Sequence, residues 1–194
     1  MRTFSGATRP FSISAVSSIN NCHYWATHDP EVTVAKMKNR PKVTVWCGMM
    51  ATKVIGPYLL RDTMNAKCYL QMLEDYVWPI ISDWENIDEL VFMHDGAPPH
   101  FTLVGSEVSG TWLGRQGPHE WPARSPDLTP CDFFLWSWAK EEVYRAKSHT
   151  LEQLEDQIQQ VITNVPCDFL QRTVDFIPSC LRKLVDTAGA YVEL

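Results

Sequence analysis

Short apolar runs and longer apolar periodicities alternate along the chain and predict a mixture of strands and helices. Residues 3–5 fit the end of a strand, and residues 11–14 alternate apolar and polar side chains as a strand does. Residues 43–49 are β-branched and almost continuously apolar, and residues 54–60 follow a short turn as the second arm of a hairpin. Pro57 restricts that arm to a sheet edge or a bulge.

Helical periodicity marks the other segments. Residues 65–84 carry apolar side chains at three- and four-residue steps, with Pro79 expected to bend the helix. Residues 103–113 predict a short helix that its two glycines weaken, and a proline-rich extended loop at 122–130 leads to a helix over 132–146.

Two further helices are predicted at the end of the chain. Thr150, with Gln153 three residues on, has the pattern of a capped helix start. Leu151 belongs to the apolar stripe of that helix, which Pro166 ends. Residues 167–187 form the last helix, which Pro178 should kink. Strands first, then a helix, a strand and more helices indicate a mixed α/β fold.

Two aspartates have settings that suit metal-assisted phosphate chemistry. Asp95 follows the apolar run 90–93 and precedes a Gly-Ala-Pro-Pro break, which predicts a buried strand with the acid at its carboxyl end. Asp132 falls in the first turn of its helix, where it can also serve as a capping acid. Asp127, in a Ser-Pro-Asp turn, is the weaker alternative to Asp132.

Composition narrows the function classes. A chain of 194 residues with 45% hydrophobic content suits one domain over 1–194 with a sizeable core. No apolar run is long enough for a membrane span, and residues 1–10 carry no secretion signal. There is no P-loop for a nucleotide cofactor, and Ser106 has no nucleophile-elbow context.

The six cysteines include no CxxC pair. Their even number permits disulfides, but six reduced thiols, several of them buried, are the expectation. His94 and His100 flank Asp95, yet no third ligand is placed by spacing, which disfavours zinc. His100 is either a hydrogen-bonded loop residue or a group that contacts a phosphate or positions an attacking water.

The formal net charge of −6 disfavours a protein that binds nucleic acid over its whole surface. Charge is still locally positive, because Lys36, Lys38, Arg40 and Lys42 alternate through one segment. This basic strip is either a solvated loop or strand edge, or a set of phosphate contacts.

Two sequence blocks, VFMHDGAPPH at 91–100 and WPARSPDLTPCDFFLW at 121–136, resemble the second and third catalytic blocks of the mariner-type transposases of the DDE superfamily. The 36 residues between the two aspartates are close to that superfamily's usual spacing. The resemblance, weaker upstream, covers nearly the whole chain. It implies a ribonuclease-H-like α/β fold with a mixed sheet flanked by helices, and a Mg²⁺- or Mn²⁺-dependent endonuclease that cuts and joins DNA in the nucleus.

The same resemblance implies that Asp95 and Asp132 are catalytic metal ligands. His100, Arg124 and the basic strip become candidates for contacting DNA, and a homodimer is an open alternative. One family position departs from the pattern: the first catalytic aspartate falls at Gly6, and residues 1–28 contain no acid.

We therefore expect weak metal binding and impaired catalysis, with a non-catalytic DNA- or protein-binding module derived from a transposase as the alternative. The N-terminal helix-turn-helix module usual in the family is expected to be absent.

Overall fold

The computed structural model of the protein describes residues 2–6, 11–14, 42–60, 64–84, 90–94, 111–114 and 128–187. Six described strands form one sheet: β1 (Arg2–Gly6), β2 (Phe11–Ser14), β3 (Lys42–Met49), β4 (Val54–Leu60), β5 (Leu90–Met93) and β6 (Thr111–Leu113). The strands predicted at 3–5, 11–14, 43–49 and 54–60 and the run at 90–93 are all confirmed.

The sheet has an antiparallel part and a parallel part. β3 pairs antiparallel with β2, β4 and β1, while β1, β5 and β6 run parallel to one another in that order. β4 pairs with β3 alone among the described strands, and their register shifts between Trp46 and Gly48. Pro57 therefore lies on a strand with no second described neighbour and within the bulge, where Gly56 and Pro57 together stand opposite Cys47, as its missing N–H requires.

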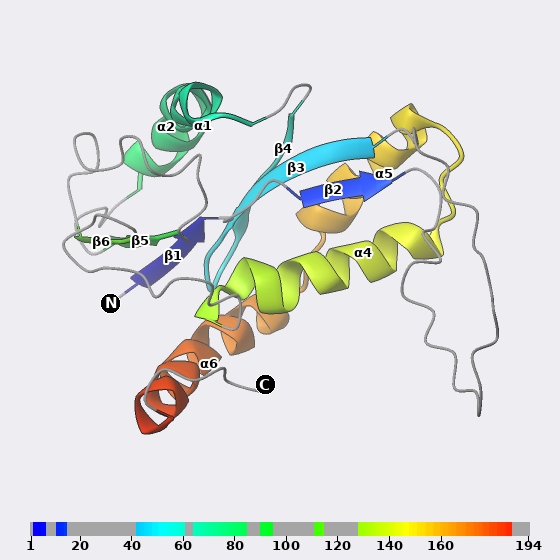
Figure 1. Cartoon of the computed structure of the whole chain (residues 1–194). Helices are drawn as coiled ribbons and strands as arrows, with labels where there is room; N and C mark the ends of the chain where they lie inside the picture. The colour runs from blue at the N-terminus through cyan, green and yellow to red at the C-terminus, as the bar shows by residue number, and fades with distance from the viewer. Residues whose placement is uncertain are drawn as a thin grey trace, which may run out of the picture.

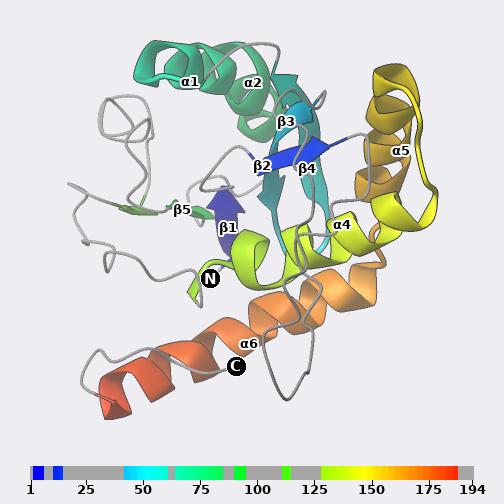
Figure 2. The same ribbon diagram turned by 45° about the vertical axis from the view of Figure 1, so that its right-hand side comes forward.

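The described helices and helical turns are α1 (Ala66–Met72), η2 (Leu73–Val77), α2 (Trp78–Ser82), η6 (Cys131–Leu135), α4 (Trp136–Arg145), α5 (Leu151–Thr163) and α6 (Cys167–Asp186). α1 and α2 lie on one side of the sheet, and α4 and α6 lie on the other (Figures 1 and 2). The parallel strands thus lie between the helical segment α1–α2 on one side and the helices α4 and α6 on the other (Figures 1 and 2).

Two of the helices begin with or contain a π-helical turn. η2 joins α1 to α2 in the segment predicted as one helix over 65–84, and η6 opens the helix that continues as α4. Pro79 falls at the start of α2, directly after η2. A π turn is a place where a helix absorbs a local irregularity, and this one lies directly before the turn that holds Pro79.

The predicted cap of α5 is present with both of its hydrogen bonds. The Gln153 N–H donates to the Thr150 Oγ1 at 3.1 Å, and the His149 N–H donates to the Gln153 Oε1 at 3.1 Å. These two bonds satisfy backbone donors that the start of a helix leaves without partners. α5 ends at Thr163, and α6 runs as one helix over Cys167–Asp186 with Pro178 in its interior.

Buried side chains from both sides of the sheet form one large core. Trp46, Val45 and Cys47 of β3 are fully buried, and Tyr69 and Leu135 contribute from helices on the two sides. Burial also explains the cysteines, because Cys47, Cys131 and Cys180 are inside and all five described cysteines are free thiols. Cys22 lies outside the described residues.

Two sequence expectations are wrong. The segment predicted as a helix over 103–113 ends in the strand β6, because Thr111, Trp112 and Leu113 pair in parallel with β5. Leu151 was placed in an apolar stripe but is exposed, as are Leu181 and Val185 near the end of α6. That end of α6 extends beyond the sheet (Figures 1 and 2).

The helix predicted from residue 132 begins at Cys131. No helix within the described ranges is long and apolar enough to cross a bilayer.

Candidate functional site

The carboxyl ends of three parallel strands meet at one edge of the sheet. Ser5 of β1 lies opposite Met93 of β5, so one more step along both strands brings Gly6 level with His94. Gly6 is also the last residue of β1 and pairs with Gly48 across β3. Ligand sites of open α/β sheets collect at this edge. Gly6 is therefore the last residue of β1, the strand next to β5, and β5 leads to Asp95.

β5 delivers the chain to this edge from a fully buried strand. All four of its residues are buried, as is His94 after it. The His94 N–H donates to the Leu113 carbonyl at 3.0 Å, which carries the β5–β6 pairing one residue further. The His94 ring centroid lies 5.5 Å from that of Phe92. Asp95 and His100 follow outside the described residues.

The first turn of η6 holds Asp132. The N–H groups of Asp132 and Phe133 both donate to the Thr129 carbonyl, at 2.8 and 3.1 Å. Asp132 is half-buried and is the acid in the first turn of this helix. A carboxylate there interacts favourably with the positive end of the helix dipole. The expected place of Asp132 in the first turn is confirmed.

A small buried cluster joins the two motif regions. Met93 of β5, Leu128 before η6, and Ile177 and Cys180 of α6 belong to it. Met93 precedes Asp95 by two residues, and Leu128 precedes Asp132 by four. The cluster therefore holds the start of η6 against the carboxyl end of β5, although the two segments are far apart in sequence.

The structure does not describe most of the other candidate residues. Lys36, Lys38, Arg40, Arg124 and Asp127 lie outside the described ranges. Lys42 is the first residue of β3, is exposed, and pairs with Ser14. Its backbone thus begins β3, which has strands on both sides, and both alternatives for the basic strip stay open.

Of the two candidate metal ligands, the structure describes Asp132 but not Asp95. Across the described ranges there is no group of three or more His, Cys, Asp or Glu side chains that could hold a metal ion. At the sheet edge Gly6 supplies no side chain, while Asp132 supplies one carboxylate. The described residues therefore do not by themselves make the three-carboxylate set that the family resemblance implies.

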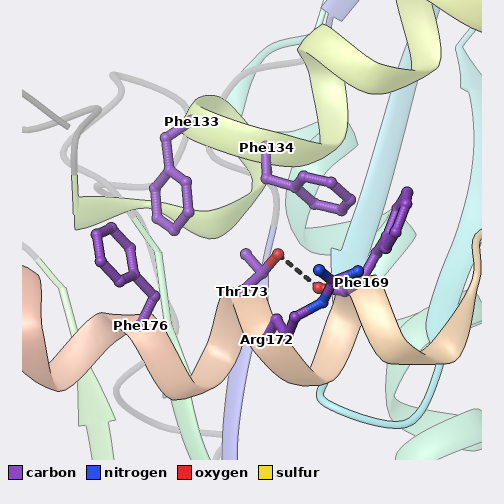
Figure 3. A pocket seen from close by; sticks show the side chains of 6 residues that line it. All are labelled: Phe133, Phe134, Phe169, Arg172, Thr173 and Phe176. Carbon is purple, nitrogen blue, oxygen red and sulfur yellow. Dashed lines mark hydrogen bonds between the residues drawn. The ribbon is translucent and has the colours of Figure 1, made fainter.

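A pocket beside Asp132 was missed by sequence reasoning. Phe133 and Phe134 of η6 and Phe169 and Phe176 of α6 line it (Figure 3). The available signal was the adjacent pair Phe133-Phe134, but a pocket depends on how two helices pack, which periodicity does not give.

Comparison with known proteins points to one group. The Tc1 transposase of Caenorhabditis elegans is 24% identical over 153 residues, covering 76% of this chain and 52% of that protein. The Tcb1 transposase of Caenorhabditis briggsae matches equally. The chain thus spans about half the length of the curated relatives it matches. No protein-family model matches the chain.

Solved structures of the Mos1 transposase share the fold. A pre-cleavage Mos1 transpososome has a TM-score of 0.74 at 21% identity, over 99% of this chain and 57% of that one. The Mos1 catalytic domain has a TM-score of 0.67 at 19% identity, over 99% of this chain and 84% of that one.

The solved structures show that the chain has the ribonuclease-H-like fold of the Mos1 catalytic domain. Its sequence is similar to the Tc1 and Tcb1 transposases, and both likenesses agree with the resemblance of the two sequence blocks to mariner-type transposases.

Proposed function

We propose that this chain is a DDE endonuclease domain, single over residues 1–194, that binds DNA and is impaired in DNA cleavage and strand transfer. The observation that carries the proposal is the parallel register of β1 and β5. It brings Gly6 level with the residue before Asp95, at the sheet edge against which the Asp132 turn packs. The proposed working place is the nucleus, where a transposon's DNA lies.

In this proposal Asp95 and Asp132 hold one divalent ion, Mg²⁺ or Mn²⁺, with weak affinity. Mg²⁺ prefers hard oxygen ligands and completes its shell with waters and substrate phosphates. When bound, such an ion activates a water or a terminal hydroxyl for phosphodiester chemistry and neutralises charge on the leaving oxygen. Mos1 complexes have been solved with Mg and with Mn, which supports this choice of metal.

Impairment follows from Gly6. The family's reaction uses three carboxylates, and a glycine at the first position leaves two. The loss of one anionic ligand should remove several kcal/mol of transition-state stabilisation, or roughly 10²- to 10⁴-fold in rate. The missing carboxylate would lower the rate by leaving an ion and its bound water without a fixed position, because the hydrogen that is the side chain of Gly6 can neither hold an ion nor orient a water.

Electrostatics shape the proposed DNA contact. Arg124, His100 and the basic strip at Lys36, Lys38, Arg40 and Lys42 would contact phosphates, which fixes position without reading sequence. With a formal net charge of −6, binding should be weak and should fall steeply with salt. Mos1 was solved as paired-end and strand-transfer complexes, which supports DNA as the partner. Assembly as a homodimer belongs to the same proposal.

A second candidate is a non-catalytic DNA- or protein-binding module derived from a transposase. Gly6 favours it, because a fold can persist after one ligand of its site is lost. The two candidates differ in metal binding, since a module without catalysis has no need of an ion held between Asp95 and Asp132.

Metal titration and strand nicking separate them. Mn²⁺ affinity should drop in Asp95→Asn and Asp132→Asn, while Asp156→Asn, at an exposed carboxylate on α5, should leave it unchanged. Nicking of supercoiled DNA should stay at background for the unaltered chain and for Asp95→Ala.

Metal-dependent nicking that vanishes in Asp95→Ala would overturn the impairment and leave a working enzyme. Equal Mn²⁺ affinity in all four proteins would instead favour the non-catalytic module.

A further inference from the structure

The pocket beside Asp132 has an unusual lining for a protein surface. Four phenyl rings, the Arg172 side chain and Thr173 line an open hollow of about 350 Å³ between η6 and α6 (Figure 3). Binding pockets for small molecules run from about 300 to 1,000 Å³. The cavity is therefore at the lower end of that range, suited to one small planar group.

The rings come from both helices and face across the gap. The Phe133 and Phe176 centroids are 6.4 Å apart at an interplanar angle of 74°, and those of Phe134 and Phe169 are 6.1 Å apart at 85°. Phe176 is nevertheless 38% exposed. The edge-to-face pairs stabilise this arrangement, yet they leave ring surface open to a ligand.

Arg172 adds a positive charge at the pocket. Its guanidinium carbon lies 4.8 Å from the Phe169 centroid, and its Nη2 lies 2.7 Å from Asp168 Oδ2. The Arg172 and Asp168 side chains are 68% and 66% exposed. A pair so open to water contributes little to stability, so a phosphate, which guanidinium binds in a bidentate manner, can compete for Arg172.

The other polar side chain of the lining, Thr173, already has a hydrogen-bond partner within the protein. Thr173 is buried, and its hydroxyl donates to the Phe169 carbonyl at 2.7 Å (Figure 3). The lining thus offers ring faces and edges with one cation, and little to read a ligand's hydrogen-bonding edge. Such a set matches a nucleotide, whose base has a flat apolar face and whose phosphate is an anion, and it tolerates any base.

We propose that this pocket receives the base of an unpaired nucleotide in bound DNA, stacked against Phe176 and Phe133, with its phosphate on Arg172. The inference rests on the proposed DNA-binding function and adds a second contact beside the sheet-edge site. Phe133 follows Asp132 directly, so the pocket and the candidate metal ligand share the helical turn η6.

The test uses the full chain at low salt with a single-stranded oligonucleotide that carries 2-aminopurine, whose fluorescence falls when it stacks. Phe176→Ala should weaken binding about 5- to 150-fold, the range for losing one base–aromatic stack. Arg172→Gln should weaken binding and reduce its salt dependence. Leu181→Ala and Arg182→Gln, at exposed sites on the same helix outside the pocket, are the matched controls.

Quenching that is lost in Phe176→Ala, with duplex DNA binding kept, supports the inference. Duplex binding by the unaltered chain without quenching would overturn the pocket's role and leave the proposed function standing. No binding to either DNA would overturn both. A change of oligomeric state in Phe176→Ala, with unchanged DNA affinity, would show that the pocket is a protein interface and overturn the inference.

Discussion

Replacing Leu128 by Ala should weaken both the fold and the proposed metal site, because Leu128 packs where the two motif regions meet. It is fully buried in the cluster with Met93, Ile177 and Cys180. The change removes three carbon groups, worth about 2.4 kcal/mol at roughly 0.8 kcal/mol each. The cavity left behind adds to this, so the expected loss of unfolding free energy is about 2.7–5 kcal/mol.

Two matched variants separate packing from position. Leu154→Ala, at a fully buried leucine of α5 in the larger core, should lose a similar amount of unfolding free energy. It should leave Mn²⁺ affinity near that of the unaltered chain, because Leu154 has no place in the cluster beside β5. Leu128→Met keeps the volume and should cost less than about 1.5 kcal/mol.

Urea unfolding followed by tryptophan fluorescence measures the first quantity, and Mn²⁺ titration of the folded proteins measures the second. A loss below about 1 kcal/mol in Leu128→Ala would mean that Leu128 is not closely packed in the cluster. Equal Mn²⁺ affinities in Leu128→Ala and Leu154→Ala would mean that the cluster does not position Asp132 for a metal.

Three further outcomes test other parts of the fold. Thr150→Ala should lower the unfolding free energy by about 1 kcal/mol, because it removes an acceptor at the start of α5; an unchanged urea midpoint would contradict the cap. Gly56→Ala should cost about 1–3 kcal/mol, since Gly56 has a φ of +111° and an added Cβ would lie 3.0 Å from the Trp46 carbonyl oxygen; equal stability of the two proteins in urea would refute this. Burial raises the pKa of the Cys47 thiol far above its ordinary value, so alkylation at pH 8 with peptide mapping should modify exposed Cys167 and spare Cys47 until the protein unfolds; rapid labelling of Cys47 in the folded protein would be the contrary result.

Strands and capped helices were predictable because their signals are local. β3 is an uninterrupted apolar run, and the Thr150 cap needs only residues three apart. β6 was not predictable in this way, because Thr111–Leu113 is three residues long and follows a glycine. Its strand character comes from pairing with β5, which is remote in sequence.

The π turns left a signal that periodicity analysis passed over. Buried residues of the first helical segment lie at 69, 72, 73, 77 and 81, and those of η6–α4 lie at 131, 135, 136, 139 and 143, so each segment contains an unbroken series of four-residue steps. In an α-helix each four-residue step turns the side chain by about 40° away from the previous one. A wider turn takes up part of that rotation. α6 contains no π turn, and its buried residues alternate three- and four-residue steps, at 170, 173, 177 and 180.

In the candidate site, too, the features with a local sequence signal were predictable and those that depend on packing were not. Motif order and spacing placed Asp132 in a first helical turn and β5 as a buried strand, and both are confirmed. The buried cluster that contains Met93 and Leu128, and the pocket between η6 and α6, could not be predicted from the sequence. Each depends on which elements pack together, and no local pattern encodes the placement of α6 against both.

The π turn η6 also determines how this domain can tolerate a change of length. A one-residue deletion within Cys131–Leu135 could be absorbed by tightening that turn to an ordinary α-helical one. α4 and the residues before η6 would then both keep their places, because the deletion removes the extra residue of the wide turn. Asp132 lies within the turn itself, so such a protein would stay folded and the change would fall on the direction of the Asp132 carboxylate.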